Sequence, residues 1–104
     1  MAWLQLVIAG LLEIGFAIGL KSAQGLNRPW VALGTLAALL GSLVLLSMAL
    51  RQLPVGTAYA VWTGIGAAGT ALVGIALLGD PATLPRLACI ASIVLGVVGL
   101  RVLA

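Results

Sequence analysis

The sequence is poor in charged residues. They make up only 7% of the 104 residues, whereas a soluble domain has about 25%. A soluble fold needs a polar exterior, and so few charges do not cover one. Hydrophobic residues make up 63% of the chain. The composition therefore indicates an integral membrane protein.

Histidine is absent, and Cys89 is the only cysteine. These counts exclude an intramolecular disulfide and remove the usual metal ligands, so we expect no metal site and no cofactor. The net charge is only +3, and no basic run with interleaved aromatics occurs. This pattern argues against a nucleic-acid partner.

Four apolar segments occupy nearly the whole chain. A helix needs about 20 mostly apolar residues to cross a bilayer, and we expect membrane helices at about residues 2–20, 30–50, 56–78 and 83–104. Strands are not expected, because no alternating pattern of about ten residues is present. The sequence predicts a single all-α membrane domain, residues 1–104. It leaves no extramembrane part to hold a soluble active site, so we expect no enzyme activity.

The basic residues that flank these segments are nearly balanced. If the helices alternate in direction, Arg51 and Arg101 lie on the side of the termini, and Lys21, Arg28 and Arg86 lie on the other. The positive-inside rule then gives almost no preferred orientation. Four short helices also make too thin a bundle to enclose a solute pathway. We therefore expect dual topology and an antiparallel homodimer.

Glu13 is the only charged residue inside the first predicted span. An ionisable group near the bilayer centre costs several kcal/mol and is functional by default. Small residues, including Ala9, Gly10 and Ala17, share its helical face, so we expect the carboxylate to point into the assembly. A purely structural carboxylate is the alternative. The favoured interpretation is a site that holds either a cation or a proton.

Polar residues also mark the second and third spans. Ser42 lies on a small-residue face, where it can hydrogen-bond Glu13 or the carbonyl four residues earlier in its own helix. The third span carries a stripe of residues at the i, i+3, i+4, i+7 and i+11 positions, which is one helical face. We interpret this stripe as a pathway wall, with plain packing as the alternative. Its members are Tyr59, Trp62, Thr63, Gly66 and Thr70.

Glycines and other small residues suggest further roles in the last two spans. Residues 64–69 match G-x-G-x-x-G, but a dinucleotide site needs a preceding strand, which is missing here. We instead expect Gly64 and Gly66 to make the helix flexible or kinked. The fourth span has a small-xxx-small ladder, which predicts a dimer contact. The ladder consists of Ala88, Ser92 and Gly96.

The segment 53–66 reads Leu-Pro-Val-Gly-Thr-Ala-Tyr-Ala-Val-Trp-Thr-Gly-Ile-Gly. Together with four spans and a lone Glu13, it resembles the small multidrug resistance family, and the resemblance covers the whole chain. The resemblance implies an antiparallel homodimer that exchanges protons for small cations by alternating access, with Glu13 of each subunit holding either one. By match of position it implies that Ser42, Tyr59 and Trp62 line or orient the site, and that Thr63 supports it.

Within that family the chain is most similar to the guanidinium exporters. The matching positions include Gly10, Thr57 and residues 78–81. That subtype has a tryptophan three residues after the glutamate, where this chain has Phe16, which keeps the aromatic face but has no N–H donor. We expect Gly10 and Phe16 to line the site. The expected function is proton-coupled export of guanidinium and small guanidinyl cations across the plasma membrane.

Other functions remain open at this point. The alternative within the family is an exporter of bulky quaternary or aromatic cations. From other classes come a cation channel and a structural subunit without transport. The structural interpretation is disfavoured, because an inert bundle gains nothing from a buried acid.

Overall fold

The computed structural model describes residues 1–23 and 27–103. These residues form four α-helices and no strand: α1 (Ala2–Ala23), α2 (Pro29–Ala49), α3 (Val55–Leu77) and α4 (Leu84–Leu103). Each helix is long and apolar enough to cross a membrane, which confirms the predicted all-α, four-span fold. α1 runs past the predicted end at residue 20, and the other bounds shift by one residue. Residues 24–26 of the first connection and the predicted end at residue 104 lie outside the described residues.

Proline and glycine set several of the helix ends. Pro29 is the first residue of α2, where the lack of an N–H costs no hydrogen bond. Pro54 immediately precedes α3. After α3, Gly79 has a φ of 75°, a conformation that glycine adopts without strain. This turn lets the amide of Asp80 donate to the carbonyl oxygen of Gly74 over 3.1 Å.

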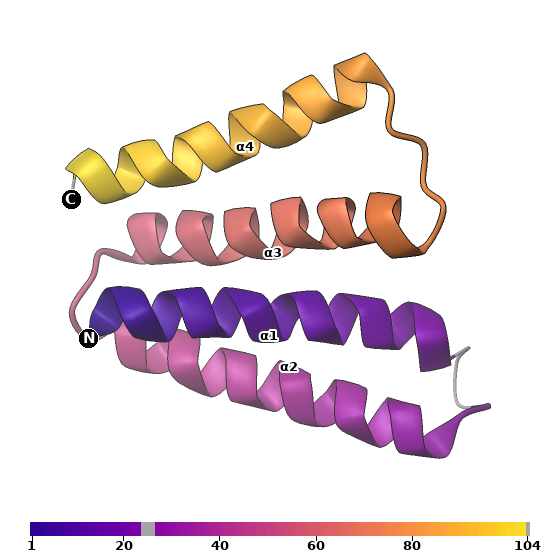
Figure 1. Ribbon diagram of the computed structural model, residues 1–104. Coiled ribbons are helices and arrows are strands. Elements are labelled where there is room, and N and C mark those ends of the chain that lie inside the picture. Colours follow the sequence, from indigo (N-terminus) through magenta and orange to yellow (C-terminus); the bar gives the residue numbers. More distant parts are fainter. Residues whose placement is uncertain (24–26, 104) are drawn as a thin grey trace.

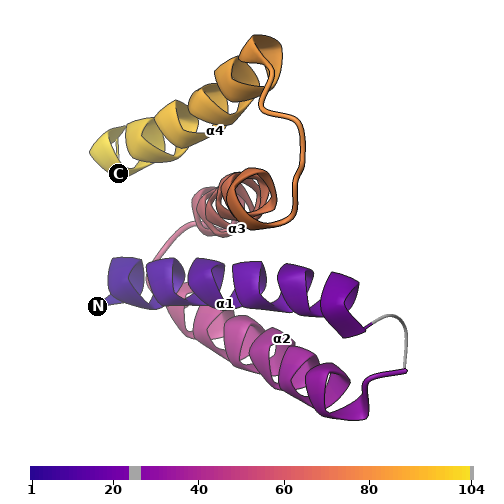
Figure 2. The same cartoon turned by 45° about the vertical axis from the view of Figure 1, so that its right-hand side comes forward.

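The helices alternate in direction and form a shallow layer. α1 packs on both α2 and α3, whereas the backbone of α4 lies close only to that of α3 (Figure 1). The molecule measures 42 × 35 × 16 Å, so its short dimension exceeds the diameter of one helix only modestly. Figure 2 shows α4 standing apart from α1 and α2. A single subunit is therefore open on both broad faces and does not form a closed bundle.

The buried core lies among α1, α2 and α3, at the end of the layer that holds the amino terminus. Its central members are Leu6 of α1, Leu46 of α2 and Val61 of α3. No residue of α4 is buried. The first three helices thus form the packed unit that positions the site, while α4 is attached along one side of α3.

Candidate functional site

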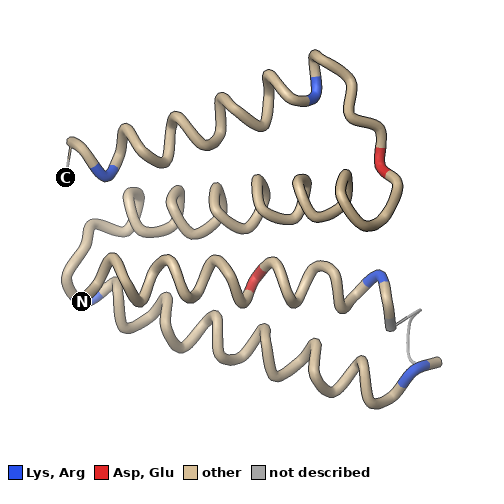
Figure 3. Tube along the Cα trace, viewed as in Figure 1, with Lys and Arg blue, Asp and Glu red and all other residues tan. Residues whose placement is uncertain are grey.

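Glu13 lies against a notch in α3 that a glycine creates. Figure 3 shows one acidic residue midway along α1, far from the basic residues near the helix ends. Opposite it, Gly66 is buried, and a Cβ built there would overlap the carboxyl group and stand only 2.8 Å from Oε1. Only glycine at position 66 therefore lets the carboxyl group lie against the α3 backbone.

The helices approach closely on both sides of this notch. A Cβ at Gly10 of α1 would overlap Ile65 of α3, and a Cβ at Gly69 of α3 would overlap Ile14 of α1. Each isoleucine fills the space that a glycine leaves on the other helix. These two reciprocal contacts fix the register of α1 on α3 and hold Glu13 opposite Gly66.

The Glu13 carboxyl group has a buried oxygen that lacks a hydrogen-bond donor. Among the described residues, nothing donates to its Oε2 atom. Buried polar atoms in native proteins are nearly always paired, so such an exception calls for an explanation. The carboxyl group lies midway along α1, and this oxygen can accept an N–H donor from a ligand.

A hydrogen-bond relay joins all three packed helices beside Glu13. The Trp62 indole N–H of α3 donates to Ser42 Oγ of α2 over 2.9 Å, and Ser42 Oγ donates to the Ala9 carbonyl oxygen of α1 over 2.6 Å. Ser42 is completely buried. In an α-helix the carbonyl of residue 9 also accepts the amide of Glu13, so the relay ends on the turn that carries the carboxyl group. Ser42 thus bonds neither of the two partners expected from the sequence.

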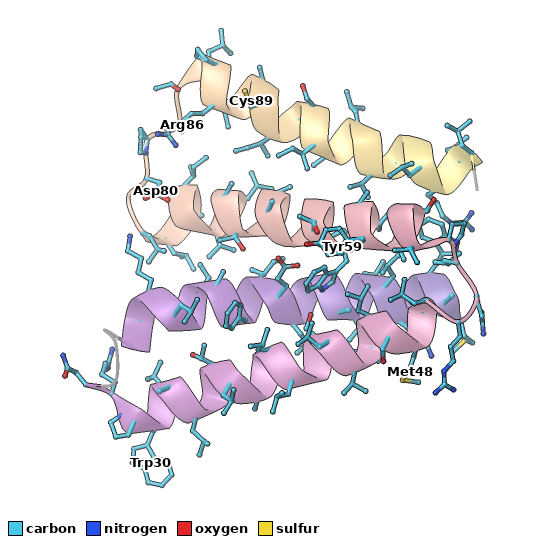
Figure 4. The ribbon with its side chains drawn as sticks, turned by 180° about the vertical axis from the view of Figure 1, so that it is seen from behind. Trp30, Met48, Tyr59, Asp80, Arg86 and Cys89 are labelled. Atoms are coloured by element: carbon cyan, nitrogen blue, oxygen red, sulfur yellow. The ribbon has the colours of Figure 1, made fainter. Side chains whose placement is uncertain are left out.

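The aromatic stripe of α3 continues from this relay to the open face of the subunit. The Tyr59 and Trp62 ring centroids are 5.5 Å apart, with the rings tilted by 54°. Tyr59 is 57% exposed and lies where α3 adjoins α1 (Figure 4). Thr63 is also exposed, and Phe16 is half-buried. Tyr59 and Thr63 are therefore free to face a second subunit or a substrate.

The remaining predicted residues lie at helix contacts or on the exposed surface of α4. Gly10 packs against Ile65, as described above, and Gly64 lies where a Cβ would meet Val97 of α4. α3 runs without a break through both Gly64 and Gly66, so their place in this structure is at close helix contacts, and flexibility stays a prediction. The dimer ladder is exposed along α4, with Ser92 Oγ bonded only to the Ala88 carbonyl over 2.9 Å and Gly96 uncovered.

Two parts of the site were missed by sequence reasoning. The Ala9 carbonyl is a backbone acceptor, so the identity of the residue at this position does not indicate its role. Gly66 was noticed as a glycine, but its contact with Glu13 depends on which faces of α1 and α3 meet. The available signal for a close approach was small residues on both helices: Gly10 on α1, and Gly66 with Gly69 three residues later on α3.

Comparison with known proteins identifies the family. The chain matches the family model described as Small Multidrug Resistance protein over residues 1–93. It belongs to this family. The family prediction is thereby confirmed, and with four spanning helices this small multidrug resistance protein is a multi-pass transporter of the inner membrane.

Relatives within the small multidrug resistance family are highly similar along their whole length. A protein of Escherichia coli O6:H1 named guanidinium exporter is 55% identical over 101 residues, which are 97% of this chain and 96% of that protein. The guanidinium exporter of Escherichia coli K12 is 54% identical over the same shares. That of Yersinia pestis is 54% identical over 97% of both chains.

Proposed function

We propose that this protein exports guanidinium and small guanidinyl cations across the plasma membrane in exchange for protons. Glu13 binds the cation and the proton in turn. The unpaired Glu13 oxygen against the Gly66 notch is the structural observation that supports this most directly. The relatives named guanidinium exporters, at 54–55% identity, support the choice of substrate.

The chemistry of guanidinium suits such a carboxyl group. Guanidinium is planar and, like the arginine head group, protonated at neutral pH, with N–H donors arranged in a fork. A carboxylate accepts two of these donors in parallel, in a short and strong charge-assisted pair. A protonated carboxyl group has lost its negative charge and no longer attracts the cation. Binding of one ligand therefore releases the other, as exchange requires.

The neighbouring residues have separate roles in this proposal. The Trp62–Ser42 relay holds the α1 turn at Ala9 and so orients Glu13. The surface that faces the substrate beside Glu13 is lined by Tyr59, Thr63 and Phe16. Because Tyr59 and Thr63 lie on an open face of a thin subunit, the pathway is completed by a second copy of the chain.

We further propose that the second copy is antiparallel. The flanking charges are nearly balanced, with two basic residues at one end of the helices and three at the other, so both insertions are accessible. The exposed ladder of Ala88, Ser92 and Gly96 supplies the contact between subunits. Reporters fused to the carboxyl terminus should then appear on both faces of the membrane. A reporter found on one face alone would contradict the antiparallel arrangement.

An exporter of bulky quaternary or aromatic cations is the second candidate, and Phe16 favours it. Without an indole N–H at position 16, the Glu13 carboxyl group has one fewer donor to orient it. It then also accepts cations that make fewer directed hydrogen bonds. Against it stands the small number of aromatic side chains near the site, since quaternary cations need open aromatic surroundings.

Transport by the purified protein in liposomes decides between these functions. We expect a proton gradient to drive guanidinium uphill and to drive a tetra-alkylammonium ion or a planar dye poorly. Strong transport of the dye with none of guanidinium would overturn the proposed substrate. Guanidinium flux that only follows its own gradient would instead identify a channel.

A further inference from the structure

A continuous apolar groove follows α1, α3 and α4 on the side of α3 that faces away from Tyr59 and Thr63. Two cavities of about 270 Å³ each share Ile65, Val97 and Val98 and so join end to end. We call this the α1–α3–α4 groove. On α3 it follows Val61 and Ile65, which are offset by two residues, or about 200° around the helix, from Tyr59 and Thr63.

The groove has the length and character of one membrane leaflet. Its deeper cavity is lined only by aliphatic side chains and glycine and reaches Leu72. From Val61 to Leu72 the helix rises about 16 Å, roughly half of a hydrocarbon core of about 30 Å. Val98 is 53% exposed and Leu72 is 48% exposed within the subunit. Both side chains leave apolar surface for another molecule to cover.

The positively charged side chain of Arg101 lies at the outer end of the groove. Arg101, in the last turn of α4, lines the outer cavity, and its Cζ atom lies 5.0 Å from the centroid of the Trp3 ring. The chain has only two acidic side chains. Glu13 is midway along α1, and Asp80 follows α3 at the opposite end of the layer, so neither can pair with Arg101. The cation–π contact uses none of the guanidinium N–H donors as hydrogen bonds.

A second copy of the chain is the competing occupant, but the predicted dimer contact lies elsewhere on α4. Val94 and Val98 line the groove, while Ser92 and Gly96 belong to the ladder. The two pairs are offset by two residues, which is again about 200° around the helix. A subunit bound through the ladder therefore leaves the groove open to the lipid.

We propose that the α1–α3–α4 groove binds one anionic phospholipid. One acyl chain lies along Ile65, Val97 and Val98, and the phosphate accepts hydrogen bonds from Arg101. Arginine pairs with phosphate in bidentate fashion, and basic residues next to membrane helices attract anionic headgroups. Trp3 is an interfacial residue that keeps the guanidinium group at headgroup depth.

Native mass spectrometry of the purified dimer tests this, with phosphatidylglycerol as the probe and phosphatidylcholine as the neutral comparison. We expect Arg101→Gln to weaken phosphatidylglycerol binding about fivefold and Arg101→Lys to retain the preference for the anionic lipid. Arg51→Gln is the matched control, because it removes a basic residue at the same end of the helices but away from the groove, and it should change nothing. Val98→Trp fills the groove and should reduce binding of both lipids.

Guanidinium binding to the same detergent-solubilised variants separates this proposal from the transport site. Arg101→Gln and Val98→Trp should bind guanidinium as the wild type does, which also shows that they are folded. Equal binding of the two lipids by the wild type would overturn the proposal. So would equal losses in Arg101→Gln and Arg51→Gln, or lipid binding to Val98→Trp at the wild-type level.

Discussion

Gly66→Ala is the sharpest test of the notch against which Glu13 lies. Atoms in ordinary van der Waals contact stand 3.4 Å or more apart, yet the new Cβ would lie 2.8 Å from Oε1 and nearer still to the rest of the carboxyl group. The α3 backbone is held by the reciprocal glycine–isoleucine contacts on both sides of position 66. The Glu13 side chain therefore yields, and its carboxyl group moves by roughly 1 Å, a displacement that matters greatly where geometry is critical.

A displaced carboxyl group keeps its charge but loses the aligned pair of acceptors. Loss of one charge-assisted hydrogen bond to guanidinium costs about 1.5–3 kcal/mol, which raises the Kd about tenfold to a hundredfold. Isothermal titration calorimetry of the purified protein measures this change directly. Gly56→Ala is the matched control, because it lies in the same helix with nothing within 4 Å of its added Cβ. It should bind guanidinium normally and be slightly more stable, since alanine favours helix over glycine.

The reasoning about the notch fails if Gly66→Ala binds guanidinium within twofold of the wild-type Kd. It also fails if Gly56→Ala loses affinity to the same extent, because the effect would then come from any glycine replacement in α3. Size-exclusion chromatography should show a dimer for both variants, which separates a displaced carboxyl group from a misfolded chain.

Three further substitutions test the relay, the exchange and the substrate choice. Ser42→Ala leaves the Trp62 N–H, in a half-buried side chain, without its acceptor, so thermal denaturation should show a loss of about 1 kcal/mol in stability. Ser47→Ala removes only a bond within its own helix and should be neutral, and equal effects of the two substitutions would refute the relay. Glu13→Gln should abolish uphill guanidinium uptake on a proton gradient in liposomes while dimer crosslinking persists, and retained uphill uptake would exclude Glu13 as the exchange site. Phe16→Trp supplies an N–H donor three residues from Glu13 and should raise the uptake ratio of guanidinium over tetra-alkylammonium; an unchanged ratio would refute a positioning role for this residue.

Much of the fold could be read from hydropathy alone, because the bilayer leaves few alternatives. A spanning helix satisfies its own backbone hydrogen bonds, so four apolar segments of suitable length predict four helices. The predicted end of the first helix, at residue 20, is three residues too early, because the polar Lys21 and Ser22 continue α1 beyond the apolar run. Nothing in a hydropathy pattern marks where a helix stops once it has left the hydrocarbon.

The candidate site was predicted in part. Glu13 stands out because a charged residue is expensive in a membrane span, and the stripe from Tyr59 to Thr70 follows from helical periodicity. Ser42 stood out as a polar residue on a small-residue face, but its acceptor was not predicted, because the Ala9 carbonyl lies on another helix. The packing role of Gly10 was also missed, since the sequence does not show that Ile65 lies opposite.

The amino-acid sequence by itself determined the membrane class, the number of helices, the deeply placed acid and the family, because each depends on composition, on local periodicity or on a contiguous motif. Only the tertiary structure decided which faces meet. Gly66 lies against Glu13, Trp62 donates a hydrogen bond to Ser42, and α4 leaves a groove beside α1 and α3 that ends at Arg101. The physical reason is that these helices are apolar on nearly every side, so the hydrophobic pattern gives little information about their rotation. In a membrane the close fit of glycine against larger side chains sets that rotation instead.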